Sequence, residues 1–309
     1  MSKDNQELRV LLQSVIPEWT GKISHVDSVA GGMTNRNFCV WVKDQPFFVR
    51  LSGVTSQSLG IERDVEFAAA HLAGCLGIAP SVEFYSGDHG LLITEYIRGS
   101  SLSATQIGSP GFLDRVVQLL RRAHGESPPL RPFSAFGTIE QYWQRVNRLA
   151  PDLLEPHRFV LPFIQDVHAV IPEHPQGLCH NDLLAANFLE DSQTRRLWLV
   201  DWEYAGVGTV YFDLGNFAAN QELTAEGEVL LAQLYFGADD VAKQVSLIRL
   251  LRIISDVREA LWGMVQQLLS PLMYDFSQYA HVHWERVERA ISDSRIQKEF
   301  ERLQGTSKS

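Results

Sequence analysis

His180-Asn181-Asp182-Leu183-Leu184-Ala185-Ala186-Asn187 is the stretch of sequence that decides the fold. It places an aspartate two residues after a histidine, and an asparagine five residues after that aspartate. This is the spacing of the phosphotransferase catalytic loop, in which the carboxylate must reach the acceptor hydroxyl while the amide bends back to hold Mg²⁺ beside the phosphates. The sequence from Gly177 to Val200 predicts short apolar strands around this polar segment, as a loop presented by a hairpin requires.

A second acidic position follows fourteen residues after Asn187. The run Leu197-Trp198-Leu199-Val200-Asp201 predicts an apolar strand that ends in an acid. Alone, such a strand end is usually structural, but its separation from the preceding loop is that of a metal ligand in a kinase-type site. Asp182, Asn187 and Asp201 are therefore predicted to form one acidic, metal-dependent cluster.

Two lobes of different character flank these segments. Short β-rich runs at 24–30, 37–42, 47–51, 81–85 and 91–95 surround one helical pattern at 61–76, which Gly77 ends. Helix-compatible segments at 110–125, 138–150 and 157–171 precede the loop, and nearly everything from Tyr211 onward is helix-compatible. We predict an α+β fold with a small β-rich N-terminal lobe, residues 1–97, and a larger, mainly helical C-terminal lobe, residues 98–309. A hinge near 96–99 and a ligand cleft between the lobes are expected.

Composition excludes several classes of protein. The chain has 27 Lys and Arg against 37 Asp and Glu, a formal charge of −10, and no basic run, which argues against binding nucleic acid or an anionic membrane. Three scattered cysteines are too few for a disulfide framework or a CxxC metal site. No apolar run approaches the roughly 20 residues of a membrane helix, and the N-terminus lacks the apolar segment of a signal peptide. The sequence predicts a cytoplasmic protein without membrane insertion and leaves the oligomeric state open.

Two further motifs make a family resemblance specific. With Asp201-Trp202-Glu203-Tyr204-Ala205-Gly206 and Phe212-Asp213-Leu214-Gly215-Asn216, the chain resembles the choline/ethanolamine kinase family. That family belongs to the aminoglycoside-phosphotransferase-like group, whose members have a protein-kinase-like two-lobe fold. The resemblance runs from about Gly31 to Trp284, and the segments 255–263 and 274–279 look like bacterial choline-kinase-type members. It implies ATP as phosphoryl donor, Mg²⁺ as cofactor and a small amino alcohol as acceptor.

The resemblance also implies roles for residues of the N-terminal lobe. Arg50 stands on the third strand, where protein kinases carry lysine, and would hold phosphate oxygens while Glu66 positions it. The alternative for Glu66 is a solvated helix charge. The remaining nucleotide-binding positions are expected in the Gly-rich turn and at the hinge, and they are Gly31, Gly32, Asn35, Glu95 and Ile97.

For the C-terminal lobe, the resemblance makes Asp182 the base or orienter of the acceptor hydroxyl and makes Asn187 and Asp201 the metal ligands. His180 and Asp213 would support the catalytic loop. A quaternary ammonium has no N–H donor, so ring faces and diffuse negative charge would recognise it. The residues expected to do so are Glu203, Tyr204, Trp262 and Tyr279. This chain departs from the family at Glu259, where some members carry a second tryptophan. Glu259 lies three residues before Trp262 on the same helix face and is expected to offer its carboxylate to the same cation.

Other readings of these residues stay open. Aromatic side chains on apolar helices are usually core, so Trp262 and Tyr279 have that alternative. The acceptor could be ethanolamine, thiamine or an aminoglycoside in place of choline. A pseudokinase-like binding module is the alternative from another functional class, although the intact Asp182, Asn187 and Asp201 favour an enzyme. Asn181 replaces the arginine that protein kinases carry beside the catalytic aspartate, so control by a phosphorylated activation loop is not expected.

Overall fold

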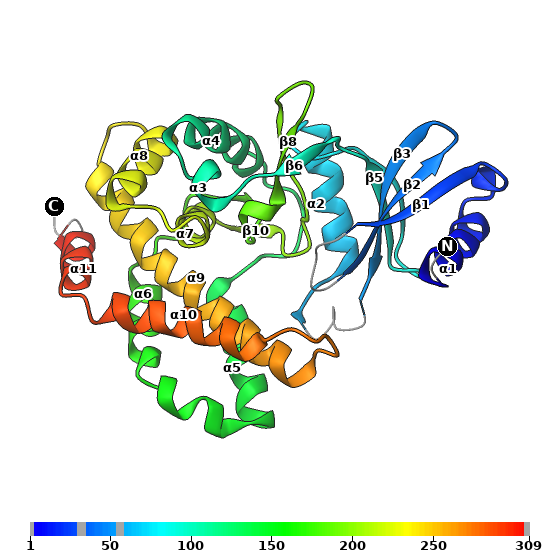
Figure 1. Ribbon diagram of the computed structural model, residues 1–309. Helices are drawn as coiled ribbons and strands as arrows, with labels where there is room; N and C mark the ends of the chain where they lie inside the picture. The colour runs from blue at the N-terminus through cyan, green and yellow to red at the C-terminus, as the bar shows by residue number, and fades with distance from the viewer. Residues whose placement is uncertain (1–2, 30–34, 54–58, 306–309) are drawn as a thin grey trace. The chain divides into compact units, whose positions relative to one another are not determined.

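The computed structural model describes residues 3–29, 35–53 and 59–305 (Figure 1). The chain divides into two compact units. The first unit runs up to Ser100 and also contains Leu189–Glu203, whereas the second contains Ser101–Phe188 and the chain from Tyr204 onward. The prediction from sequence placed a single boundary after residue 97, and the structure adds residues 189–203 to the first unit.

A five-stranded antiparallel sheet forms the centre of the first unit, with the strand order β1-β2-β3-β5-β4. Its strands are β1 (Ile23–Val29), β2 (Asn35–Val42), β3 (Gln45–Ser52), β4 (Val82–Ser86) and β5 (Leu91–Glu95), and helix α2 (Arg63–Cys75) follows β3 along the chain. Side chains alternate between the faces of a strand. Val49 and Leu51 of β3 therefore enter the hydrophobic core on one face, while Arg50 lies on the other face.

The core that contains Val49 and Leu51 is covered by a helix that the sequence analysis did not predict. Helix α1 (Lys3–Val15), followed by the short turn η1 (Pro17–Trp19), packs Leu8 and Leu12 against buried residues of the sheet such as Val40. The two leucines are four residues apart and share one face of the helix. Leu11 and Val15 also pack against this core, so the buried face has the i, i+3, i+4, i+7 spacing of an amphipathic helix, a signal that the sequence analysis did not use.

A three-stranded sheet explains why residues 189–203 join the first unit. Its strands are β6 (Gly99–Ser101), β8 (Phe188–Asp191) and β9 (Leu197–Leu199), in the order β6-β8-β9. The backbone N–H of Leu199 donates to the carbonyl of Ile78 (2.8 Å). At Gly99 the strands approach so closely that a Cβ atom would lie 2.2 Å from the carbonyl oxygen of Glu190, so only glycine fits there.

The second unit is mainly helical and is organised around one long helix. Its helices are α3 (Ala104–Ile107), α4 (Pro110–His124), α5 (Ala135–Leu149), α6 (Val160–Val170), α7 (Val210–Asn220), α8 (Ala225–Phe236), α9 (Val241–Leu269), α10 (Phe276–Ile291) and α11 (Arg295–Gly305). The short turns η3 (Pro151–Leu153), η4 (Glu155–His157) and η5 (Ala185–Asn187) and the paired strands β7 (Gln176–Cys179) and β10 (Gly206–Thr209) complete it. Helix α9 packs against α5, α7 and α10 (Figure 1).

Close contact between α7 and α9 depends on a glycine. A Cβ atom at Gly215 would lie 2.7 Å from the backbone nitrogen of Arg252. The two helices can therefore approach at this point only without a side chain on α7.

The β-rich first unit and the helical second unit confirm the predicted α+β class. Among the described residues, none of the helices combines the length and apolar character needed to span a bilayer.

Candidate functional site

The predicted catalytic loop leaves β7 at Cys179 and is held by a buried carboxylate of α7. The backbone N–H of His180 donates to Asp213 Oδ2 (2.7 Å), and that of Asn181 donates to Asp213 Oδ1 (2.6 Å). Asn181 adopts a left-handed backbone conformation with φ of 65°. Asparagine tolerates this region better than most residues. Asp213 therefore lies where the sequence analysis expected support for the loop.

Asn216, one turn after Asp213, extends the same support. Its Oδ1 accepts the backbone N–H of Leu183 (2.6 Å), and its Nδ2 donates to Ser255 Oγ on α9 (2.9 Å). Gln221 Nε2 donates to the carbonyl of Leu183 (2.7 Å). Both polar groups of the Leu183 backbone are thus bound by buried side chains. The sequence analysis quoted Asn216 within a motif but assigned it no role.

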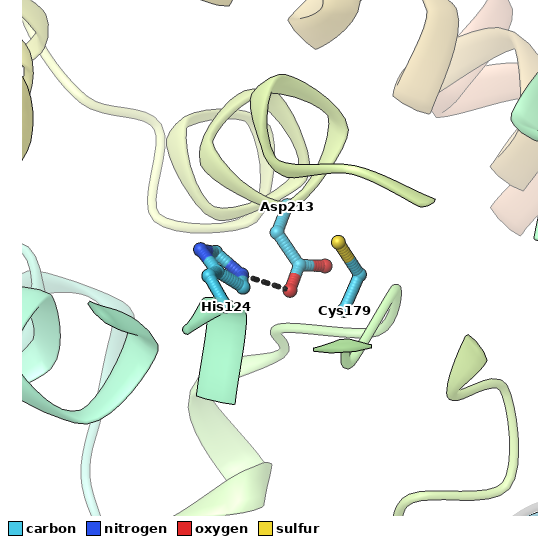
Figure 2. Close-up of side chains that lie close together, drawn as sticks. All are labelled: His124, Cys179 and Asp213. Carbon is cyan, nitrogen blue, oxygen red and sulfur yellow. Dashed lines mark hydrogen bonds and ion pairs between the residues drawn. The ribbon is translucent and has the colours of Figure 1, made fainter. Parts of the chain in front are cut away.

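Asp213 also belongs to a buried group with His124 and Cys179, whose potential ligand atoms lie within 4.8 Å of one another (Figure 2). His124 Nε2 lies 3.0 Å from Asp213 Oδ2, and its Nδ1 lies 2.7 Å from the Tyr235 hydroxyl. Burial and the nearby Asp213 charge raise the pKa of the Cys179 thiol well above its usual value. A protonated thiol is a poor metal ligand. These contacts make the group a hydrogen-bonded support for the loop.

The charge of Asp213 is stabilised by its partners. Burial by itself raises the pKa of this carboxyl, but the hydrogen bond and charge of His124 and the His180 backbone outweigh it, and the pKa falls below its usual value. A carboxylate with a lowered pKa stabilises the fold above the pKa of the unfolded chain, about 3.9. This contribution is lost as the pH falls through the lower pKa of the folded state.

We expect Asp213→Asn to lower the free energy of unfolding by about 2–4 kcal/mol at pH 7, since an amide NH₂ group would face a backbone N–H donor. Urea unfolding followed by circular dichroism measures the change. The difference from wild type should shrink below pH 4. Asp293→Asn is the matched control, because the exposed Asp293 also accepts a backbone N–H, from Arg295 (2.9 Å). Equal losses in both variants would contradict the support assigned to Asp213.

Asp182 and Asn187 lie side by side in the loop. Asn187 Nδ2 donates to the Asp182 carbonyl (2.9 Å) and lies 3.3 Å from Asp182 Oδ2. The backbone N–H of Asp182 donates to Nδ1 of the buried His180 (3.3 Å). The Asp182 side chain remains 15% exposed. The structure therefore brings these three residues together and leaves the carboxylate accessible.

Aromatic residues of the second unit meet near the end of α9. Trp262 Nε1 donates to the Tyr204 hydroxyl (3.0 Å), and the Trp262 ring meets Tyr279 edge-on at a centroid distance of 5.3 Å. A Cβ atom at Gly263 would lie 3.0 Å from the Tyr279 ring and 3.1 Å from Ala280, so α10 packs directly on α9 here. The three expected aromatic residues form one cluster, in which Trp262 is 8% exposed.

Glu259 lies on the same stretch of α9, but its carboxylate has partners of its own. Oε1 accepts a hydrogen bond from Arg258 Nε (3.0 Å), and Oε2 accepts one from the Tyr279 hydroxyl (2.7 Å). Burial raises the pKa of Glu259, but the charges of Arg258 and His283 outweigh it, and the pKa is lowered. Burial and Glu259 raise the pKa of Tyr279 well above its usual value. Glu259 is thus an ionised carboxylate paired with an arginine that the sequence analysis did not single out.

The first unit contains a buried cluster of charges around Arg50. Arg50 Nη1 donates to Asp201 Oδ1 (2.7 Å), and the guanidinium also pairs with Glu66, a residue only 2% exposed. Arg63 joins the cluster through Glu66 (2.6 Å) and Glu203 (3.3 Å). Glu66 is therefore a buried ion-pair partner, and the alternative of a solvated helix charge is wrong. Arg63 is a further residue that the sequence analysis missed.

Glu203 completes this cluster. Its Oε2 accepts a hydrogen bond from Asn35 Nδ2 (2.9 Å), while Asn35 Oδ1 accepts one from Arg63 (2.9 Å). Burial and the neighbouring Asp201 raise the pKa of Glu203. Asn35 and Glu203 are 168 residues apart in the sequence. The cation-binding role expected of Glu203 stays a prediction.

Asn187 and Asp201 offer oxygen ligands. Asn187 uses its amide nitrogen to hold Asp182, so the amide oxygen is its ligand atom. The Asp201 side chain is 32% exposed, and its backbone is left-handed, with φ of 67°. Carboxylate and amide oxygens are the donors that a hard cation such as Mg²⁺ prefers. The residues present fit the expected cofactor.

The structure describes only some of the other residues expected to bind the nucleotide. Gly31 and Gly32 lie outside the described residues. Glu95 is the exposed last residue of β5, and its backbone N–H donates to the Ser81 carbonyl (2.9 Å). Ile97 is buried, and its carbonyl accepts the N–H of Gly99 (3.1 Å). Their expected contacts with adenine stay predictions.

Comparison with known proteins finds similarity to phosphotransferases. The model of the Phosphotransferase enzyme family matches residues 25–243. Ethanolamine kinase 2 of Mus musculus is 24% identical over 312 residues, which cover 89% of this chain and 78% of that protein.

Solved structures extend the likeness to the fold. A choline/ethanolamine kinase family protein from Mesorhizobium loti has a TM-score of 0.82 and 25% identity, covering 96% of this chain and 98% of that chain. Choline kinase LicA from Streptococcus pneumoniae has a TM-score of 0.73 and 22% identity, covering 94% and 99%. These likenesses confirm the predicted protein-kinase-like fold.

Proposed function

Because the chain belongs to the Phosphotransferase enzyme family, we propose that it transfers the γ-phosphoryl group of ATP to the hydroxyl of choline or ethanolamine. One observation carries the proposal furthest. Asp182 and Asn187 lie in contact in a loop whose backbone is held by Asp213 and Asn216, and the Asp182 carboxylate stays accessible. The named relatives supply the class of acceptor, since they include ethanolamine and choline kinases.

In this proposal Asp182 orients the acceptor hydroxyl and takes its proton. The hydroxyl oxygen forms a bond to the γ-phosphorus as the bond between that phosphorus and ADP breaks, and the products are a phosphate monoester and ADP. The protein contributes little covalent chemistry, because positioning and charge stabilisation supply most of the catalysis. The rigid support of the loop by α7 serves this requirement.

We assign the metal ligands to Asn187 and Asp201, following the spacing of the two motifs along the chain. Magnesium held by these two side chains would neutralise negative charge on the phosphates of ATP. Arg50, paired with Glu66 and Asp201, is assigned to the phosphates. A guanidinium presents a fork of N–H donors that matches phosphate oxygens.

The amine is assigned to the aromatic cluster of Tyr204, Trp262 and Tyr279. Trp262 of α9 binds the Tyr204 hydroxyl through its Nε1, and its ring contacts the ring of Tyr279. Ring faces attract a quaternary ammonium, which has no N–H to donate. The Glu259 carboxylate is bound by Arg258 and Tyr279, so little free carboxylate charge is left to attract a primary ammonium specifically. This favours choline as the first acceptor to test.

An ADP-release assay of the purified protein tests the proposal. The acceptors are choline, ethanolamine, thiamine and kanamycin, each with ATP and Mg²⁺. We expect acceptor-dependent ADP release with choline or ethanolamine and none above the acceptor-free rate with the other two. ADP release that depends only on thiamine or kanamycin would show that this compound, and not an amino alcohol, is the acceptor. Absence of acceptor-dependent ADP release with all four compounds would support a non-catalytic binding module.

We expect Trp262→Ala to raise the KM for choline by roughly 10-fold and the KM for ethanolamine by less. A cation over an aromatic ring contributes about 1–2 kcal/mol, and a primary ammonium can replace the lost ring by hydrogen bonds. The cation is remote from the reacting oxygen, so kcat should change little. Steady-state kinetics on both amines measure the difference.

Trp284→Ala is the matched control, because Trp284 is a buried tryptophan of α10 that stacks on His157. It should lower the melting temperature without changing the ratio of the two KM values. If both variants lose stability and neither changes this ratio, Trp262 is a core residue.

A further inference from the structure

Arg258 joins the predicted catalytic loop from a helix far away in the sequence. It lies on α9 and is only 4% exposed. Its Nη1 donates to the backbone carbonyl of Asn181, 77 residues away in the chain. Its Nη2 lies 3.8 Å from Asp182 Oδ1. One guanidinium thus contacts both the backbone of the loop and the carboxylate assigned to the acceptor hydroxyl.

We propose that Arg258 is a positioning residue that fixes the Asp182 carboxylate for phosphoryl transfer. This inference rests on the proposed function, since it concerns the residue that orients the acceptor. A guanidinium is planar and offers several donors in fixed directions. It can therefore bind the Asn181 carbonyl and still direct a second nitrogen toward Asp182.

The guanidinium is itself held in place from several sides. Glu259 accepts hydrogen bonds from it, and the Tyr279 hydroxyl binds the other Glu259 oxygen (2.7 Å). The rings of Tyr204 and Phe212 lie 5.7 Å and 5.4 Å from the central carbon of Arg258. These contacts restrict the rotamers of a long side chain that would otherwise lose considerable entropy on ordering. A continuous chain of contacts therefore runs from Tyr279 through Glu259 and Arg258 to Asp182.

The local backbone explains why the positive charge comes from α9. In protein kinases the residue directly before the catalytic aspartate is arginine. Here that residue is Asn181, whose backbone is left-handed and whose side chain donates to the Tyr204 carbonyl (3.0 Å). Asparagine suits this conformation better than arginine does. The loop therefore has no arginine of its own beside Asp182, and α9 supplies one.

A buried arginine can also serve stability alone, and the predicted kinetics separate the two roles. A positioning residue acts on the geometry of the reacting hydroxyl, where a misplacement of about 1 Å costs roughly 10²-fold in rate. We expect Arg258→Met to lower kcat by roughly 10²-fold, with the KM values for ATP and choline within about three-fold of wild type. Arg258→Lys retains the charge but not the fork, and should lose roughly 10-fold in kcat.

Arg252→Met is the matched control. Arg252 lies on the same helix, and its Nη1 also donates to a backbone carbonyl, that of Leu223 (2.8 Å), and to a carboxylate, that of Glu228 (2.6 Å). It has no contact with the catalytic loop among the described residues. Its replacement should lower the melting temperature and leave kcat per folded molecule unchanged.

The experiment measures kcat and KM for the wild type and the three variants, with kcat divided by the fraction of molecules that bind Mg²⁺-ATP. We expect kcat to fall moderately in Arg258→Lys and further in Arg258→Met, whereas Arg252→Met should have the kcat of the wild type. If Arg258→Met does not fold, the Arg258→Lys value decides. Unchanged kcat in Arg258→Lys, or equal falls in Arg258→Met and Arg252→Met, overturns the positioning role. A wild type without acceptor-dependent turnover overturns the proposed function instead, before any variant is compared.

Discussion

Asp182→Asn is expected to lower kcat by roughly 10²–10⁴-fold, the contribution of a positioned general base. The affinity for ATP should stay within a few fold of wild type, because the proposal places this carboxylate against the acceptor hydroxyl and not against the nucleotide. Single-turnover and steady-state rates with choline measure the loss, and a binding titration with Mg²⁺-ATP measures the affinity.

The asparagine variant has nearly the same size as the wild-type residue, so the contact with Asn187 (2.9 Å to the Asp182 carbonyl) need not change. A melting curve checks that the loop stays folded. A variant that keeps near-wild-type kcat would remove Asp182 from the mechanism.

Asp201→Ala should weaken Mg²⁺-ATP binding and turnover together, by roughly 10²-fold or more, since a metal ligand stabilises both the bound nucleotide and the transition state. The Asp201 carboxylate also accepts a hydrogen bond from Arg50 (2.7 Å), which keeps its pair with Glu66 when Asp201 is removed. The fold of the first unit should therefore survive the change. Calorimetric titration with Mg²⁺-ATP measures the affinity.

Asp191→Ala serves as the control for this second change. Asp191 ends β8, the neighbour of β9 in the same sheet, and its exposed carboxylate binds only turn residues such as Thr194 among the partners described. It should leave nucleotide binding unchanged. Normal Mg²⁺-ATP binding by Asp201→Ala would show that the end of β9 is not a metal-binding position.

Local sequence patterns predicted most elements of the fold. Each expected strand of the first unit is present within two residues of its predicted ends, because the alternation of apolar residues and the turn residues between runs are local signals. Helix α1 was missed although Leu8, Leu11, Leu12 and Val15 have the spacing of an amphipathic helix and mark its buried face. The addition of residues 189–203 to the first unit depends on pairing between β6 and β8, which are distant in the sequence.

The spacing of Asp182, Asn187 and Asp201 identified the positions of the candidate site, but not the side chains that support them. His124 reaches Asp213 across 89 residues, and Arg258 reaches Asn181 across 77. No periodicity or turn signal encodes such contacts. One signal was available, because Asp256, Arg258 and Glu259 lie within an apolar helical stretch, and buried charges must find partners.

Sequence position alone also left the charge of the amine pocket undetermined. Glu259 was expected to face the cation because it lies one turn before Trp262. The structure shows that its carboxylate binds Arg258 and Tyr279. A residue's face on a helix can be predicted from spacing, whereas its choice among several partners depends on the packing of α10 against α9.

The transfer of phosphate to an amino alcohol is tested most directly by following the phosphorus itself. Wild-type protein is incubated with ATP, Mg²⁺ and an equimolar mixture of choline and ethanolamine, and the reaction is followed by ³¹P NMR beside Asp182→Asn. The account predicts loss of the γ-phosphate signal of ATP and growth of a phosphate monoester signal, mainly phosphocholine, with the wild type alone. Consumption of ATP to inorganic phosphate without a monoester, or equal monoester formation by Asp182→Asn, would contradict it.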